Sequence, residues 1–107
     1  MNVTPLILDI DEDAQSDIAE IGLYYAERDR DIENRFYQAV DQTIQMLTQS
    51  PYLGERCQFR NPKMKGIRVW QVSGFRNYLI FYRPHGDVLH VLRIFHGARD
   101  YTTMFNE

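Results

Sequence analysis

Apolar residues recur at helical spacing in two stretches of the first half of the chain. Ala14, Ile18, Ile21 and Tyr25 lie three or four positions apart, which predicts an amphipathic helix that starts in the acidic cluster at 9–13. A second stripe with similar spacing predicts a second helix and consists of Ile32, Phe36, Val40, Ile44 and Leu47. Each stripe requires an apolar surface to cover.

Polar residues and a proline mark the ends of these helices. Asp29 or Asp31 is the expected N-cap of the second helix. Ser50-Pro51 is expected to end it, because proline disfavours helix in the residue before it. The short connection between the stripes predicts an antiparallel helix hairpin. The solvated face of the first helix is expected to carry Asp17, Glu20 and Glu27.

Runs rich in β-forming residues occupy the start of the chain and its second half. Residues 3–8 predict an edge strand, in which Pro5 needs no ladder donor. Three later runs predict further strands at 67–72, 77–82 and 88–95, and the last is apolar on both faces, as a central strand would be. The predicted turns lie at 73–74 and 84–87. A short helix within 98–105 is expected to dock back through Tyr101, Met104 and Phe105.

The predicted order is β-α-α-β-β-β with a short C-terminal helix. Strands and helices are segregated, so the fold class is α+β, with the helix hairpin packed on one face of a small, mainly antiparallel sheet. The 107 residues suit one domain spanning 1–107. Residues 51–66 show little pattern, and we expect a long loop of the kind that is functional or mobile.

Charge divides the chain sharply, although the net charge is only −3. Residues 1–55 contain twelve acidic and three basic side chains, whereas residues 56–99 contain nine basic and one acidic. This asymmetry suggests an anionic partner for the C-terminal half, unless acidic helices and basic strands merely neutralise each other.

The composition also bears on location. Cys57 is the only cysteine, which excludes an internal disulfide and fits a reducing compartment. No apolar run approaches the roughly 20 residues of a membrane helix. The first residues lack the basic and small residues of a signal peptide. We therefore expect a cytoplasmic protein without a membrane partner.

Five segments in series resemble the ParE/RelE toxin superfamily over nearly the whole chain. The most specific are 75–83, which is similar to the family's Y-x-I-x-Y strand, and 93–100, which is similar to the ParE ending h-x-v-x-H-G-x-R. The other three are the Asp-Ile pattern before Tyr25, the pair Arg35-Phe36 with the Pro-x-x-Gly motif at 51–54 that follows the second helix, and Gly66-Ile67-Arg68.

The resemblance implies the toxic half of a type II toxin–antitoxin pair, neutralised by a cognate antitoxin from the same operon. It implies one of two targets, because ParE toxins poison DNA gyrase whereas RelE toxins cut mRNA in the ribosomal A site. The acidic helices and the isoelectric point of about 5.6 favour the ParE branch, since an RNA-cutting enzyme needs a broadly basic surface. A toxin-like protein that binds antitoxin but has lost toxicity is a third hypothesis.

Candidate target-contacting residues lie in the basic half. For gyrase binding without covalent chemistry they are Arg68, Arg76, Arg83, Arg93, His96 and Arg99. For metal-free RNA cleavage, which needs a base, an acid and cations near the phosphate, they are Arg68, Arg83, His96 and Tyr101. Two alternatives stay open: His96 is a hydrogen-bonded strand-end residue, and Arg83 and Arg93 are sheet-surface charges.

No cofactor is expected, and a metal site is disfavoured. His90 and His96 lie six residues apart, so both are expected to point to the same face of their strand. The distance between them, about 20 Å at roughly 3.3 Å per residue, is too long for both to bind one ion. Aromatic side chains on the helices cannot all face the sheet, so those left outside predict a surface for antitoxin binding or self-association in a homodimer or toxin–antitoxin hetero-oligomer. These antitoxin-binding candidates are Tyr24, Tyr25, Phe36 and Tyr37.

Overall fold

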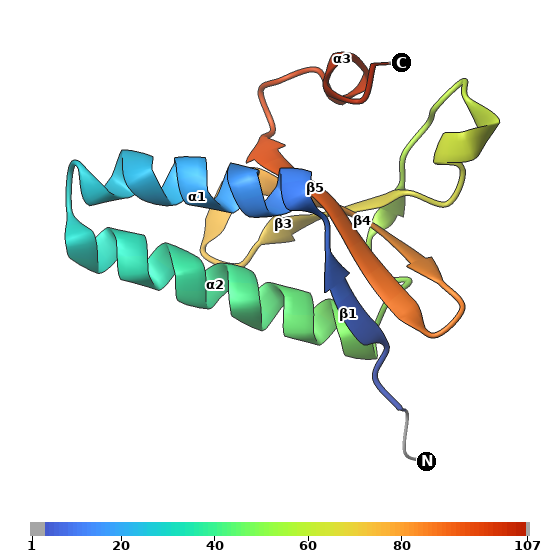
Figure 1. Cartoon of the computed structure of the whole chain (residues 1–107), viewed down its shortest axis with the longest axis horizontal. Coiled ribbons are helices and arrows are strands. Elements are labelled where there is room, and N and C mark those ends of the chain that lie inside the picture. Colours follow the sequence, from blue (N-terminus) through green and yellow to red (C-terminus); the bar gives the residue numbers. More distant parts are fainter. Residues whose placement is uncertain (1–3, 107) are drawn as a thin grey trace.

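A helix pair lies against a five-stranded sheet in the computed structural model, which describes residues 4–106 (Figure 1). The strand order is β1-β5-β4-β3-β2, with β1 parallel to β5 and the other neighbours antiparallel. The α+β class predicted from the sequence is confirmed. The elements are β1 (Ile7–Ile10), α1 (Glu12–Ala26), α2 (Arg30–Gln49), β2 (Glu55–Arg56), the 3-10 turn η1 (Pro62–Met64), β3 (Arg68–Val72), β4 (Phe75–His85), β5 (Val88–His96) and α3 (Tyr101–Met104).

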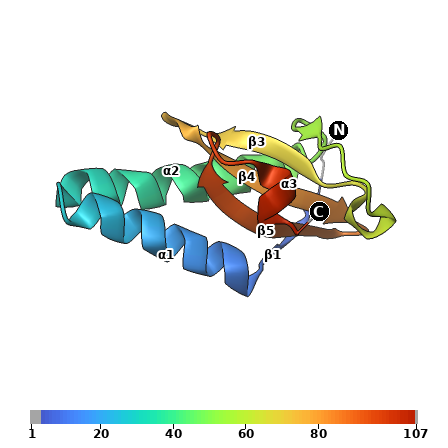
Figure 2. The ribbon, with the colours of Figure 1, turned by 90° about the horizontal axis from the view of Figure 1, so that it is seen from above.

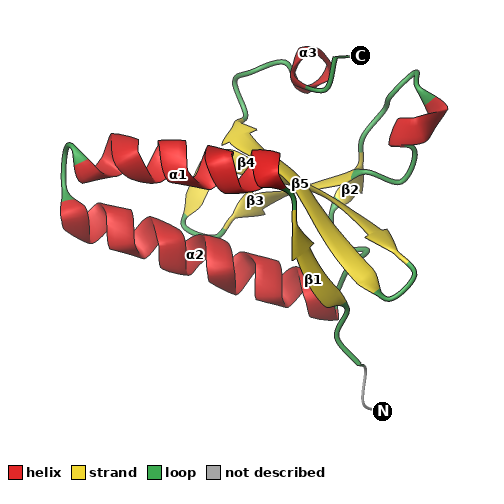
Figure 3. Ribbon diagram, viewed as in Figure 1, coloured by secondary structure: helices red, strands yellow, loops and turns green. Residues whose placement is uncertain are grey.

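The two long helices form the predicted antiparallel hairpin. Figures 1 and 3 show α1 and α2 side by side over one face of the twisted sheet. The Asp29 carboxylate accepts from the Asp31 backbone N–H at 2.9 Å, so Asp29 is the N-cap of α2. As predicted, α2 stops at Gln49, one residue before Ser50-Pro51. No helix within residues 4–106 is long and apolar enough to cross a membrane.

The helix-covered face of the sheet holds the larger core. Phe36, Val40, Ile44 and Leu47 of the predicted second stripe are all buried. They pack against strand residues that point to the same face, namely Val72, Ile80, Tyr82, Leu89, Val91 and Ile94. The helical spacing in the sequence therefore identified this core correctly.

The position of Asp17 corrects the prediction that this residue belongs to the solvated face of α1. Its side chain is buried, with 7% of the residue exposed, and it accepts from Arg93 Nε at 2.7 Å, Arg93 Nη2 at 3.0 Å and the Ile94 N–H at 2.9 Å. Asp17 lies three positions after Ala14 and four before Ile21, so helical spacing itself places it among the buried residues. The paired guanidinium is what makes this burial tolerable.

The edge strands differ from the prediction in two ways. β1 spans Ile7–Ile10 rather than 3–8, and Pro5 precedes it; Val3 lies outside the described residues. The 51–66 segment is not a featureless loop, because it contains β2 and η1. β2 pairs with β3 through Glu55↔Val69, and the Cys57 N–H donates to the Ile67 carbonyl at 2.9 Å.

The β4–β5 hairpin is longer and tighter than predicted. β4 continues to His85, so the turn at 84–87 shrinks to Gly86-Asp87, with Gly86 at a positive φ of 59°. Phe81 faces Arg93 and Tyr82 faces Val91, which leaves Leu92 as an extra residue in β5. This bulge shifts the alternation of side chains along β5 by one residue. His90 and His96 therefore point to opposite faces of the sheet, and the expectation that they share one face is wrong.

The opposite face of the sheet, here called the open face, carries a smaller aromatic cluster. Ile67, Phe81 and Phe95 are buried there. Figure 2 shows α3 over β4 and β5, and the predicted docking of the C-terminal segment is confirmed through Tyr101, Met104 and Phe105. Phe59 and Met64, from the segment around η1, complete the cover.

Candidate functional site

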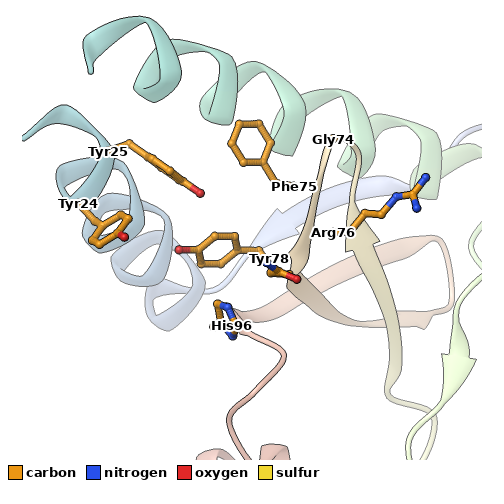
Figure 4. Close-up of a pocket in the computed structure, with 8 residues that line it drawn as sticks. Tyr24, Tyr25, Gly74, Phe75, Arg76, Tyr78 and His96 are labelled. Carbon is orange, nitrogen blue, oxygen red and sulfur yellow. The ribbon is translucent and has the colours of Figure 1, made fainter. Parts of the chain in front are cut away.

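A cavity of about 530 Å³ opens where the end of α1 meets the strand ends (Figure 4). Three elements supply its walls: α1, the β3–β4 turn with the start of β4, and the end of β5. The hairpin and α1 meet there because Tyr25 packs against Phe75 and Tyr78 with ring centroids 5.6 and 6.2 Å apart. We call this cavity the tyrosine pocket, and its lining residues are Tyr24, Tyr25, Gly74, Phe75, Arg76, Asn77, Tyr78 and His96.

The tyrosine hydroxyls give the pocket polar groups on an aromatic frame. Figure 4 shows the hydroxyls of Tyr25 and Tyr78 directed into the space beside Tyr24. Burial, followed by the neighbouring Tyr25, raises the pKa of Tyr78 to about 12. The Tyr78 phenol, which is protonated at neutral pH even at its ordinary pKa, stays protonated well into the alkaline range and can donate as well as accept.

His96 is held in one tautomer. Its Nδ1 accepts a hydrogen bond from the Ala98 backbone N–H at 3.0 Å, so Nδ1 carries no proton. In the neutral ring the proton must then lie on Nε2, which can only donate. The ring stands edge-on to Tyr78 at 5.5 Å. His96 is thus the hydrogen-bonded strand-end residue considered above, and its remaining nitrogen is a donor to any bound group.

The charge around the pocket is basic. Arg76 is the only charged residue that lines it among those described, and Figure 4 shows its guanidinium pointing away from the rings. Arg28, just after α1, stacks on Tyr24 at 3.7 Å from the ring centroid and donates to the Tyr24 carbonyl at 2.8 Å. The pocket therefore suits polar acceptors or anionic groups on a partner.

Three arginines of the predicted target-binding set hold the fold together. Arg68 donates to the carbonyls of Tyr52 and Gly54 at 3.3 and 2.8 Å, which fixes the segment after α2. Arg83 donates to the Lys63 carbonyl at 2.8 Å and so fixes η1. Arg93 pairs with Asp17, and the hydrogen bond between them is the main reason that the pKa of Arg93 is raised.

Comparison with known proteins identifies the family. A family model described as the ParE toxin of the type II toxin–antitoxin system parDE matches residues 8–101. The chain belongs to the ParE toxin family. No curated protein matches it.

Two solved structures share the ParE-family fold of this chain. The chromosomal ParDE toxin–antitoxin system of P. aeruginosa has a TM-score of 0.69 at 18% identity, covering 85% of this chain and 95% of that chain. The toxin–antitoxin complex RelBE2 of Mycobacterium tuberculosis has a TM-score of 0.60 at 16% identity, covering 87% and 99%. At such identities the likeness shows the fold alone.

In this ParE-family chain, the four residues considered for RNA cleavage do not converge. Arg68 and His96 lie on the helix-covered face, opposite Tyr82 and Tyr78 respectively, about 13 Å apart along β4 at roughly 3.3 Å per residue. The other two candidates lie on the open face. Arg83 pairs across the ladder with His90, and the Tyr101 ring packs against Phe81 with centroids 5.7 Å apart.

The aromatic residues predicted for antitoxin binding divide between the core and the surface of the ParE-family hairpin. Phe36 is fully buried, so it supports the hairpin from within and offers no surface to a partner. Tyr25 is partly buried against the same core, while Tyr24 and Tyr37 stay 47% and 38% exposed. Leu23, which the helical pattern did not single out, is 61% exposed and adds to this surface.

Arg76, His96 and Arg99 remain exposed at one end of the sheet. The Arg99 N–H donates to the His96 carbonyl at 3.0 Å, which ties the start of the C-terminal segment to the end of β5. The sequence singles out Arg76 and His96 because they lie in the basic C-terminal half of the chain. Their association with Tyr24 and Tyr25 depends on α1 lying across the strand ends, a contact that spacing within one element cannot reveal.

Proposed function

We propose that this chain arrests growth by binding DNA gyrase without covalent chemistry, and that a cognate antitoxin neutralises it. Membership of the ParE toxin family supports the toxin role. The observation that carries the choice of target is the separation of the RNA-cleavage candidates over two faces of the sheet. Metal-free cleavage needs a base, an acid and cations within hydrogen-bond reach of one phosphodiester.

His96 adds a second argument for binding over cleavage. A general base must offer an unprotonated nitrogen to the 2′-hydroxyl, but Nδ1 of His96 is engaged by the Ala98 N–H. The other nitrogen carries the proton, so the ring is arranged to donate. A donor imidazole beside the tyrosine hydroxyls and basic Arg76 suits recognition of a partner surface rather than proton abstraction.

The antitoxin is proposed to bind the outer side of the helix hairpin. Leu23, Tyr24 and Tyr37 expose apolar area there, although Tyr37 also bonds Glu33 at 3.3 Å. An amphipathic antitoxin helix could cover these side chains as in other helix-in-groove complexes. Tyr24 also lines the tyrosine pocket, so such a complex would mask part of the proposed gyrase-binding surface.

Pulse labelling after brief induction without antitoxin tests the target in cells. If gyrase is inhibited, thymidine incorporation falls before methionine incorporation. An earlier fall in methionine incorporation would contradict the proposal and favour a ribosome-dependent nuclease. Unchanged incorporation of both would mean that the chain has the fold of a toxin without its activity.

A supercoiling assay with purified gyrase tests the surface. His96→Ala should weaken inhibition by roughly tenfold, because it removes the donor and the ring wall of the pocket. His85→Ala is the matched control, since His85 lies at the opposite end of β4. Equal loss in both variants, or loss in neither, would count against the tyrosine pocket as the contact site.

A further inference from the structure

Three potential metal ligands meet on the open face, where β1 runs beside β5 (Figure 1). They are Asp9 within β1, Asp11 just before α1, and His90 near the start of β5. One donor atom from each lies within 4.8 Å of the others. This group lies apart from the tyrosine pocket and includes no residue proposed to contact gyrase or antitoxin.

The backbone fixes all three positions. Asp9 faces His90 in the parallel ladder between β1 and β5. The Asp11 N–H donates to the Val91 carbonyl at 2.9 Å, which extends the attachment to β5 by one residue beyond the end of β1. Two of the side chains therefore start from paired strand positions and the third from the residue that follows β1, unlike acidic residues that cluster on a mobile surface loop.

The donor atoms lie close enough together to reach one transition-metal ion. His90 Nδ1 and the Asp9 carboxylate are 2.9 Å apart, at hydrogen-bond distance. Zinc–nitrogen and zinc–oxygen bonds are about 2.0–2.1 Å, so two tetrahedral ligands lie about 3.3 Å apart, slightly farther than this pair. A donor atom of Asp11 lies within 4.8 Å of both, so a modest movement of its side chain would bring it to the same ion.

The Asp11 carboxylate is not used in capping the helix. It occupies the N-cap position of α1, yet its side chain makes no capping hydrogen bond. One of its oxygens lies within 4.8 Å of donor atoms of Asp9 and His90, so it is placed to be the third ligand.

We propose that Asp9, Asp11 and His90 bind one divalent transition-metal ion of the zinc class. Imidazole with two carboxylates is a ligand set for such an ion, whereas magnesium and calcium prefer oxygen alone. When Nδ1 of the neutral imidazole binds the ion, the ring proton lies on Nε2. The ion joins β1, β5 and the start of α1, and its remaining coordination positions are open to water or to a side chain of a partner.

Calorimetric titration of the tag-free, full-length chain with zinc chloride at pH 7.5 is the first test. We expect one saturable site per chain, at least tenfold weaker in His90→Gln and in Asp11→Asn. His85→Gln and Asp87→Asn are the matched controls, and both should bind zinc like the unmodified chain. Zinc at 100 times its dissociation constant should raise Tm by about 10 °C.

Two further measurements distinguish a specific metal site from nonspecific binding of the metal at the surface. Cobalt should give visible absorption bands that are lost in His90→Gln, since they report the ligand field of the bound ion. Non-saturable binding, equal competition by magnesium, or unchanged affinity in His90→Gln would overturn the proposal and leave an acidic cluster only. None of these measurements involves gyrase, so their outcome is independent of the proposed toxin mechanism.

Discussion

The two faces of the sheet are covered by segments of very different kinds. On one face lie a 15-residue and a 20-residue helix, and twelve described residues are buried in the resulting core. On the open face, a three-residue turn and a four-residue helix cover a cluster in which three described residues are buried. Regular cover excludes water from a broad area, whereas short irregular segments leave their aromatic residues partly exposed. We therefore expect stability to depend chiefly on the helix-covered face.

The largest expected effect is the loss of Phe36 from the helix-covered core. Its side chain is completely buried and contacts the rings of Tyr25, Phe75 and Tyr78. Phe36→Ala should lower the free energy of unfolding by about 3–5 kcal/mol, because it removes buried area and leaves a cavity. Urea unfolding followed by circular dichroism measures this change. A loss below about 1 kcal/mol would contradict the expectation that stability depends chiefly on the helix-covered face.

Removal of the buried charge pair should have the next largest effect. Asp17→Asn keeps the size of the side chain but leaves the Arg93 guanidinium without its anion, at a cost of about 2–3 kcal/mol. Asp13→Asn, one turn earlier on an exposed position, is the matched control and should cost less than about 0.5 kcal/mol. Similar losses in the two variants would show that α1 is not attached to β5 through Asp17.

Truncation of an aromatic residue on the open face should cost less. Phe105 packs edge-on to Phe59 and Phe81 at 5.3 and 5.5 Å, but it stays partly exposed. Phe105→Ala should therefore lower the free energy of unfolding by about 1–2 kcal/mol. Limited proteolysis should show earlier cleavage within 97–106 than in the unmodified chain. A loss as large as that of Phe36→Ala would remove the proposed difference between the faces.

The smallest effect concerns alkaline pH. The folded chain raises the pKa of Tyr78 from about 10 to about 12, mainly through burial, so the neutral phenol is favoured. The associated stability is fully present below about pH 10 and is lost as pH rises towards 12. Tyr78→Phe should therefore flatten the decline in urea midpoint over this range. An unchanged decline would assign the alkaline sensitivity to other groups, such as Cys57, whose pKa burial raises to about 11.

Much of the helix-covered face could be predicted because its determinants are local. The stripe from Phe36 to Leu47 follows helical periodicity, and Asp29 and Ser50-Pro51 act within a few residues of the helix ends. The apolar character of β5 on both faces predicted a central strand; β5 is an interior strand with a partner on each side, although β4 holds the centre of the sheet. The open face was harder to predict, because β2 and η1 have no periodic signal and depend on pairing with β3 and on the hydrogen bond from Arg83 to Lys63.

The sequence by itself determined the family, the element order and the two amphipathic stripes, since these reside in local spacing and in motifs such as that at 93–100. Only the tertiary structure decided which polar and charged side chains lie next to one another. The extra residue Leu92 turns His90 and His96 to opposite faces, Asp17 engages Arg93, and the chain brings Tyr24 beside His96 and Asp11 beside His90. These contacts depend on strand register and helix placement, which arise from packing across the whole fold rather than from residues that are neighbours in the sequence.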